Sequence, residues 1–322
     1  MILSDFLPAT PDRSWDYALQ CGVTHAICKC APELTGMASP DEAGVLETIR
    51  DRFAARGLTL VGLEGDEFDM TRIKYGLPGR DGDFERYRNL LTRMGEAGIP
   101  LLCYNFMAGI GWFRTNEKVP ARGGAISNRF RVSEMDPALF SEVRNITEDE
   151  LWENYRTFIE AVMPAAEAAG VKMGLHPDDP PLSPLGGVGR IFSTADNFAK
   201  AMSLSDSPSH GITYCQANFR AMGEDLFATV RRFADRMVFV HFRDVEGTRE
   251  DFTETFHDNG PTDMAAILKH YHDSGFRGPI RVDHVPSLSG EENLPHGYAL
   301  LVRLFALGYL KGILDAHKIP HT

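Results

Sequence analysis

The sequence predicts an α/β protein, a TIM (β/α)8 barrel with long βα loops at its C-terminal face. Eight short apolar runs without strict alternation are typical of parallel strands buried on both faces. Stretches with helical periodicity separate these runs. The length of 322 residues fits one barrel of ~250 residues with insertions. We therefore expect residues 1–322 to form a single domain.

Each predicted strand is a run of four to six residues, and a helix-like stretch follows each one. Segments 39–42 and 147–150 place a cap residue and acids at two helix starts, and glycines stand where several helices should stop. The expected strands are 1–6, 24–28, 58–63, 100–105, 171–175, 211–215, 237–241 and 279–283. The expected helices are 12–21, 41–56, 83–97, 148–169, 194–204, 223–235, 262–274 and 293–311.

Two connections are longer than simple links. Residues 106–147 form a loop insertion after the fourth strand, and residues 242–260 follow the seventh strand; neither shows clear periodicity. Both should emerge at the C-terminal face of the barrel. Long structureless loops there are usually lids or substrate clamps, so we expect these two to cover a functional site.

The overall composition excludes several function classes. The formal net charge of −12 disfavours binding to the phosphate backbone of a nucleic acid. No window approaches the ~20 apolar residues of a membrane span, and the N-terminus lacks the basic start of a secretory signal. Five cysteines make a disulfide framework improbable, which favours a cytoplasmic location. Homodimerisation is the commonest assembly for such barrels.

Four side chains that bind metals each stand at the end of a predicted strand. They are His176, Cys215, His241 and Asp283. Each alone is weak support for a metal, but strands of a parallel barrel converge at one mouth, so the set predicts a shared ion. Two imidazoles, one sulfur and one carboxylate suit Mn²⁺, Fe²⁺, Co²⁺ or Zn²⁺ better than Mg²⁺ or Ca²⁺.

Further candidates surround the predicted metal site. The run 176–181, His-Pro-Asp-Asp-Pro-Pro, has stiff prolines that would aim Asp178 or Asp179 into the mouth, although a rigid turn with solvated aspartates explains it equally well. Asn105 ends the fourth strand, where it could hydrogen-bond a substrate hydroxyl. Arg114 could form a bidentate fork with a substrate carboxylate, or lie free on a surface loop.

The remaining candidates concern proton transfer and charge. His284 follows Asp283 and should point another way, so it could act as acid or base, or support a ligand instead. Tyr298 could donate a proton or merely pack. Arg243 lies near the mouth, where it could bind the substrate or form a structural ion pair with Asp244. Glu64 follows the third strand at a position that could enter the mouth.

At these residues the chain resembles the mannonate dehydratase family, barrel enzymes of the xylose-isomerase-like group. The likeness runs from about the fourth strand to the C-terminus, whereas the N-terminal third matches poorly. Around Cys215 and Asp283 the chain departs from the usual family segments, reading Gln-Ala-Asn at 216–218 and Arg-Val-Asp-His-Val at 281–285. The motifs that carry the resemblance are 104–107 with 112–115, 176–181 with 189–194, 241–243, 259–264, 283–284 and 297–298.

The resemblance implies an activity and roles for several residues. It implies dehydration of a sugar acid, D-mannonate, to 2-keto-3-deoxy-D-gluconate with a divalent metal, typically Mn²⁺. It assigns the metal to the four ligands above and proton transfer to His284 and Tyr298, without saying which is the base. Two rivals stay open: a metal-dependent sugar isomerase or epimerase, which loses no water, and a sensor that binds a sugar acid without turnover.

Overall fold

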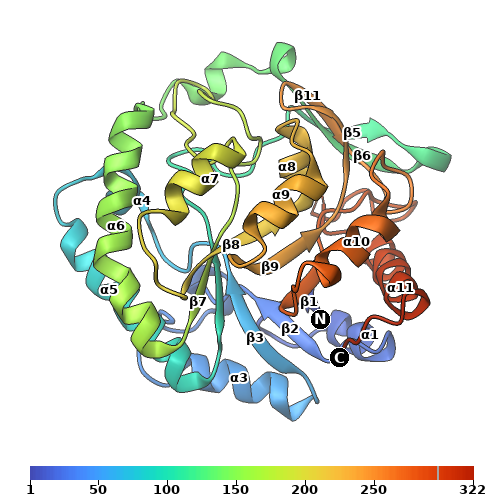
Figure 1. The fold of residues 1–322 in the computed structure, drawn as a ribbon, viewed down its shortest axis with the longest axis horizontal. Helices are drawn as coiled ribbons and strands as arrows, with labels where there is room; N and C mark the ends of the chain where they lie inside the picture. The colour runs from blue at the N-terminus through green and yellow to red at the C-terminus, as the bar shows by residue number, and fades with distance from the viewer. Residues whose placement is uncertain (296) are drawn as a thin grey trace.

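The computed structural model describes residues 1–295 and 297–322 and contains a closed barrel of eight parallel strands (Figure 1). The strands neighbour one another in the order β1-β12-β9-β8-β7-β4-β3-β2. This confirms the predicted fold class, and every predicted strand is present within two residues at each end. The barrel strands are β1 (Ile2–Phe6), β2 (His25–Cys28), β3 (Thr59–Glu64), β4 (Leu101–Tyr104), β7 (Lys172–Leu175), β8 (His210–Cys215), β9 (Met237–Phe242) and β12 (Pro279–Val282).

Helices surround the barrel, and the two chain ends lie side by side on it (Figure 1). The Met1 amino group donates a hydrogen bond of 2.7 Å to the carbonyl of Pro320. The sequence indicated eight of these helices and missed the short α2, α4 and α8. The helices are α1 (Arg13–Gln20), α2 (Pro32–Thr35), α3 (Val45–Ala55), α4 (Thr71–Tyr75), α5 (Arg80–Ala97), α6 (Glu148–Ala169), α7 (Ala195–Met202), α8 (Gln216–Ala221), α9 (Leu226–Phe233), α10 (Met264–Asp273) and α11 (Leu300–Ala316).

Helix ends agree with the sequence signals in some places and not in others. Thr147 and Glu150 form the capping box of α6, and Gly170 ends that helix with φ of 68°. The prediction for α11 was wrong by seven residues at its start. The carboxylate of Glu291 accepts hydrogen bonds from the backbone N–H groups of Leu300 and Leu301, so the helix begins only there.

The two long connections are not structureless, contrary to the expectation from their sequence. They pair with each other in a four-stranded antiparallel sheet of order β10-β11-β6-β5. Phe130 and Phe252 stand opposite each other across β6 and β11, with ring centroids 5.8 Å apart. The strands of this sheet are β5 (Asn116–Pro120), β6 (Ile126–Arg131), β10 (Val245–Thr248) and β11 (Asp251–Glu254).

The barrel interior is filled by a small apolar cluster. Ile27, Val61, Leu101, Cys103 and Phe239 are buried there together. Side chains two positions apart on a strand share a face, so the inward row of β9 continues from Phe239 directly to His241. The apolar cluster therefore supports the polar residues at the mouth from below.

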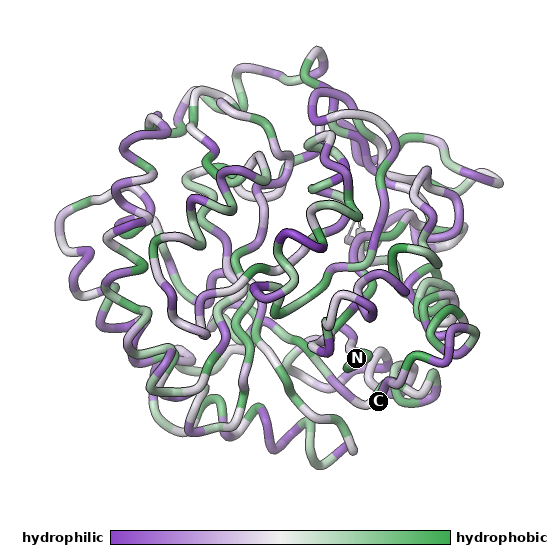
Figure 2. Tube along the Cα trace, in the orientation of Figure 1, coloured by the Kyte–Doolittle hydropathy of each residue, from purple (hydrophilic) through white to green (hydrophobic). Residues whose placement is uncertain are grey.

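A larger apolar core lies between the barrel and its helices. Hydrophobic residues run along the barrel strands and along α11, whereas the other outer helices contain both hydrophobic and hydrophilic residues (Figure 2). Among residues 1–295 and 297–322, none of the helices combines the length and the apolar character that a membrane span requires.

Candidate metal centre and active site

A cavity of about 970 Å³ opens at the C-terminal ends of the barrel strands. Residues at or just after the ends of β2, β3, β4, β7, β9 and β12 line it. Its volume falls within the range of small-molecule sites, ~300–1,000 Å³. The polar residues described below meet at this cavity or directly behind its wall.

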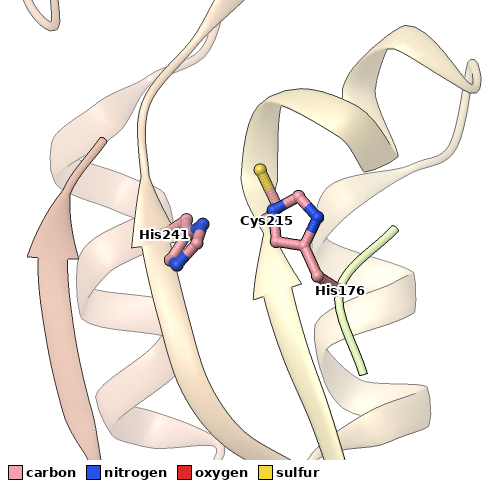
Figure 3. A group of neighbouring side chains, drawn as sticks. All are labelled: His176, Cys215 and His241. Carbon is pink, nitrogen blue, oxygen red and sulfur yellow. The ribbon is translucent and has the colours of Figure 1, made fainter. Parts of the chain in front are cut away.

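Three of the four predicted metal ligands form one group. The ligand atoms of His176, Cys215 and His241 all lie within 4.8 Å of one another. Figure 3 shows Cys215 at the end of β8 and His241 on β9, with His176 on the segment that follows β7. Successive strands of the barrel thus bring side chains far apart in sequence to one point.

The chemistry of this group fits a divalent metal ion. Both ring nitrogens of His241 are buried and lack an aligned hydrogen-bond partner among the described residues. Burial alone would raise the pKa of the Cys215 thiol, but Arg243 and the two histidines lower it to about 5. The thiolate is the form that binds metals. A buried thiolate beside two imidazoles is a set of ligands suited to a borderline-soft cation.

The fourth predicted ligand, Asp283, stands at the edge of this group. Its Oδ2 atom lies 3.5 Å from Nδ1 of His241. The same carboxylate is held by two arginines, with Nε of Arg243 at 2.8 Å and Nη2 of Arg281 at 2.9 Å. Burial opposes ionisation, but His284 and the two arginines keep the pKa of Asp283 well below its usual range.

Glu64, the last residue of β3, also contacts His241. Its Oε2 atom lies 3.3 Å from Nε2 of His241 and 2.9 Å from Nε of Arg281. Despite burial, Arg281 and His241 lower the pKa of Glu64 to about 2. Cys103, for which the sequence showed no ligand pattern, joins Glu64 and His241 in a second close group.

The two predicted proton-transfer residues face the same cavity. The rings of His284 and Tyr298 lie 5.3 Å apart and nearly perpendicular, and Trp112 flanks the other side of His284. Nδ1 of His284 lies 3.0 Å from Oε1 of Glu254. Although Tyr298 as a whole is 36% exposed, loss of water around its phenol and the nearby Asp283 carboxylate raise its pKa above the usual value, so the phenol stays protonated at neutral pH.

Arg114 and Arg243 are buried behind the cavity wall and bind protein carboxylates. Arg114 donates to Asp179 at 2.5 Å and to Glu254 at 2.6 Å. Arg243 donates to Asp179 at 2.7 Å and contacts Asp283. The sequence suggested that Arg114 could form a bidentate fork with a substrate carboxylate. In the structure its donors instead bind the carboxylates of Asp179 and Glu254. Asp179, not either arginine, reaches the cavity lining.

The two remaining substrate-binding candidates have different surroundings. Asp178 is buried and accepts hydrogen bonds from the backbone N–H of Phe192 at 2.7 Å and from Arg190, so it stabilises its own loop. Asn105 lines the cavity, and its Oδ1 accepts a hydrogen bond of 3.0 Å from Nζ of Lys74. The structure therefore separates the neighbours Asp178 and Asp179, which the sequence could not distinguish.

Sequence reasoning missed two contributors to the site. Glu254 lies on β11 of the second sheet, and no sequence pattern marked this strand, because Phe252 is the only apolar residue among 251–254. Lys74 lies on the short helix α4 and lines the cavity. No sequence signal marked Lys74, because a lysine in a five-residue helix usually points to solvent.

Comparisons with known proteins identify relatives of this chain. The family model D-mannonate dehydratase (UxuA) matches residues 44–140 and 127–321. A mannonate dehydratase of Endomicrobium trichonymphae is 34% identical over 281 residues, covering 76% of this chain and 77% of that protein. Mannonate dehydratase 2 of Halalkalibacterium halodurans is 35% identical over 297 residues, covering 83% and 85%.

Solved structures extend the comparison to three dimensions. The crystal structure of mannonate dehydratase from Streptococcus suis serotype 2 superposes with a TM-score of 0.88 at 30% identity, covering 98% of this chain and 94% of that one. A xylose isomerase domain protein from Planctomyces limnophilus, at 14% identity, reaches a TM-score of 0.63 over 98% and 96% of the two chains. This second likeness concerns the barrel fold alone.

Proposed function

The chain belongs to the mannonate dehydratase family of hydro-lyases, and we propose that it dehydrates D-mannonate to 2-keto-3-deoxy-D-gluconate. One observation carries the proposal. A group of two histidines and a cysteine suited to a divalent metal stands at the same barrel mouth as His284 and Tyr298, a facing pair of proton-transfer side chains. Loss of water from a sugar acid needs both parts.

The family implies a divalent metal, and we propose that His176, Cys215, His241 and Asp283 hold it. Mn²⁺ is our choice of ion, because it is the ion typical of the family; the mixed ligand set would also accept Fe²⁺, Co²⁺ or Zn²⁺. When bound, such an ion supplies positive charge where negative charge develops on the substrate carboxylate as the C2 proton leaves. Glu64 supports the site by holding His241 in place.

His284 is suited to be the base that removes the C2 proton. Because the Glu254 carboxylate only accepts hydrogen bonds, Nδ1 of His284 must carry the proton in their contact of 3.0 Å. Nε2 is then the free lone pair. The negative charge of Glu254 also stabilises the imidazolium that forms when Nε2 takes the proton. Burial opposes that charge, but His284 and Arg114 keep the pKa of Glu254 below its usual value.

Tyr298 is suited to be the acid. Its protonated phenol faces the ring of His284 from 5.3 Å, which places the two groups to serve adjacent carbons of one substrate. The phenol proton goes to the C3 hydroxyl, which leaves as water while the C2 electron pair forms the carbon–carbon double bond. The resulting enol becomes the 2-keto acid by tautomerisation.

We propose that substrate hydroxyls meet Asn105 and Asp179, which line the cavity. Arg114 and Arg243 then act indirectly. Each pairs with Asp179, so the two arginines hold that carboxylate in its ionised form and in one orientation. Asp178 fixes the loop that carries Asp179.

The decisive experiment is a semicarbazide assay for 2-keto acid, with the purified protein, Mn²⁺ and a panel of aldonic acids that includes D-mannonate. We expect product from D-mannonate, and none after the metal is removed with a chelator. Product from another acid alone would contradict the proposed substrate. Binding of D-mannonate without product from any acid would contradict the reaction itself.

Two further proposals concern where and how the enzyme works. All five cysteines are free, which suits a reducing cytoplasm. A homodimer stays a prediction from the general behaviour of such barrels, and sedimentation of the purified protein would test it.

A further inference from the structure

We propose that Lys74, together with Asp66 and Asn105, forms a subsite that binds the hydroxyl groups at the far end of the sugar acid and selects substrates by chain length. We call these three residues the β3–β4 subsite. The inference rests on the proposed function. In that function the metal and the proton-transfer pair hold the carboxylate end of the substrate, so the other end of its chain lies elsewhere in the cavity.

The β3–β4 subsite is built at strand ends other than those that carry the reactive groups. The predicted metal ligands and His284 come from β7, β8, β9 and β12 or the segments that follow them, and these four strands are consecutive around the barrel. Asp66 and Lys74 follow β3, which is four strands from β9 in the closed order, and Asn105 follows β4. All three residues line the same cavity as His241 and His284.

The three side chains are bonded to one another through Lys74. Its Nζ atom donates to Oδ2 of Asp66 at 2.5 Å and to Oδ1 of Asn105 at 3.0 Å. The Lys74 side chain is only 5% exposed, whereas that of Asp66 is 31% exposed. A buried ammonium has three N–H donors, and these two bonds leave one donor for a ligand in the cavity.

The bonds also fix the amide of Asn105. Its Oδ1 accepts from Lys74 and from the backbone N–H of Met107 at 3.1 Å, which identifies the oxygen and leaves the amide NH₂ as the free end. The subsite therefore offers two kinds of donor, an ammonium and an amide, beside one carboxylate acceptor. A hydroxyl donates one hydrogen bond and accepts others, so adjacent hydroxyls match this set.

The size of the cavity makes polar contacts the means of selection. At about 970 Å³ the cavity is far larger than a six-carbon acid needs, so steric contact with its walls does not limit the length of the substrate. A site built to hydrogen-bond hydroxyl groups discriminates against a molecule that lacks them, because its buried polar groups are then left unpaired. Lys74 is the buried charged member of the subsite and should carry most of this discrimination.

The test compares two acids with the wild type and Lys74→Met. D-Mannonate has six carbons, and L-erythronate keeps its configuration at C2 and C3 but ends at C4. We expect Lys74→Met to lower kcat/KM for D-mannonate about 10- to 100-fold, the size of one or two hydrogen bonds to a charged group, mainly through KM. For L-erythronate kcat/KM should stay unchanged. An equal loss with both acids would overturn the proposal.

Two further variants separate this role from a structural one. Lys29→Met removes another lysine of the same cavity wall. Lys29 forms an ion pair of 4.0 Å with Glu33, and its removal should leave the preference for D-mannonate intact. Asp66→Asn tests the subsite at its more exposed member if Lys74→Met does not fold, and should also reduce the preference. If Asp66→Asn keeps the full preference, the subsite does not exist.

A binding measurement keeps the inference separate from the proposed reaction. Calorimetric titration of the Mn²⁺-loaded protein, carried out in the His284→Asn background with and without Lys74→Met, gives the ratio of Kd values for the two acids without turnover. We expect the ratio to shrink in Lys74→Met even if the wild type forms no 2-keto acid, which would contradict only the proposed reaction. A ratio that Lys74→Met leaves unchanged would overturn the subsite, whether or not the wild type is active.

Discussion

Glu254 lies 3.0 Å from Nδ1 of His284, and this contact joins the second sheet to the barrel. Glu254 ends β11, whereas His284 follows the barrel strand β12. The same carboxylate accepts a hydrogen bond from Arg114, which stands on the other long connection. Both insertions therefore meet at the residue that contacts His284, and we propose that the second sheet takes part in catalysis through this contact.

We expect Glu254→Gln to impair turnover without loss of metal. The amide keeps the size of the side chain but removes the negative charge that stabilises protonated His284. Turnover should fall by up to ~10²–10⁴-fold, the full contribution of a general base. Measured kcat and metal content decide this. Asp251→Asn, an exposed change on the same strand, is the control, and full activity in Glu254→Gln would contradict the role.

Cys215→Ala should remove the metal. The thiolate is the only sulfur in the group of His176, Cys215 and His241, and alanine leaves two imidazoles and the Asp283 carboxylate, which hold a divalent ion less well. Metal analysis after gel filtration in Mn²⁺-containing buffer should show a loss of bound ion. Cys21→Ala, at a half-buried thiol outside the site, should retain it. Normal metal content in Cys215→Ala would remove this residue from the ligand set.

For His284→Asn we expect the metal to stay bound, in contrast to Cys215→Ala. The ligand group does not include His284, so the variant should keep its metal while turnover falls about 10²–10⁴-fold. Parallel measurements of metal content and 2-keto acid formation test both halves. His270→Asn on α10 serves as the matched control. If the metal is lost with His284, the residue supports the ligands and its catalytic assignment is wrong.

A pH effect on stability is expected from Glu67, outside the catalytic groups. Burial raises the pKa of its carboxyl to about 8, although the backbone N–H of Cys30 donates to it at 2.8 Å. Between pH 4.5 and about 8 the unfolded chain releases this proton and the folded chain keeps it, so stability falls as pH rises. Glu67→Gln should remove that contribution, up to ~1.4 kcal/mol per pH unit. Urea denaturation of both proteins across this range measures it, and identical slopes would contradict the shift.

The sequence was informative about the barrel because each strand is a local apolar run with a helix after it. The four candidate ligands stand at the ends of such runs. The topology of a parallel barrel alone is enough to bring the ends of these runs to one mouth. The second sheet was missed because its strands have only four to six residues and its central pair, β6 with β11, joins residues more than a hundred positions apart. Pairing at that distance leaves no periodic signal in either segment.

The contacts of single side chains were out of reach for the same reason. Asp178 and Asp179 are neighbours with the same chemistry, and only the fold shows that one binds the backbone of Phe192 and the other binds two arginines. Arg114 carried the right group for a substrate carboxylate. Its partners Asp179 and Glu254 come from two other segments, and the sequence does not show that they converge on it.

The contact between Glu64 and His241 leads to a last prediction, on metal affinity. A carboxylate beside the second ring nitrogen of a ligating histidine fixes the ring, and its removal typically weakens metal binding ~10–100-fold. We expect a loss of this size in Glu64→Gln, measured as Mn²⁺ affinity by electron paramagnetic resonance titration. Glu33→Gln changes another glutamate of the cavity lining, one whose side chain is 66% exposed, and should leave the affinity as it is. Equal affinities in wild type and Glu64→Gln would contradict the role of Glu64 in holding His241.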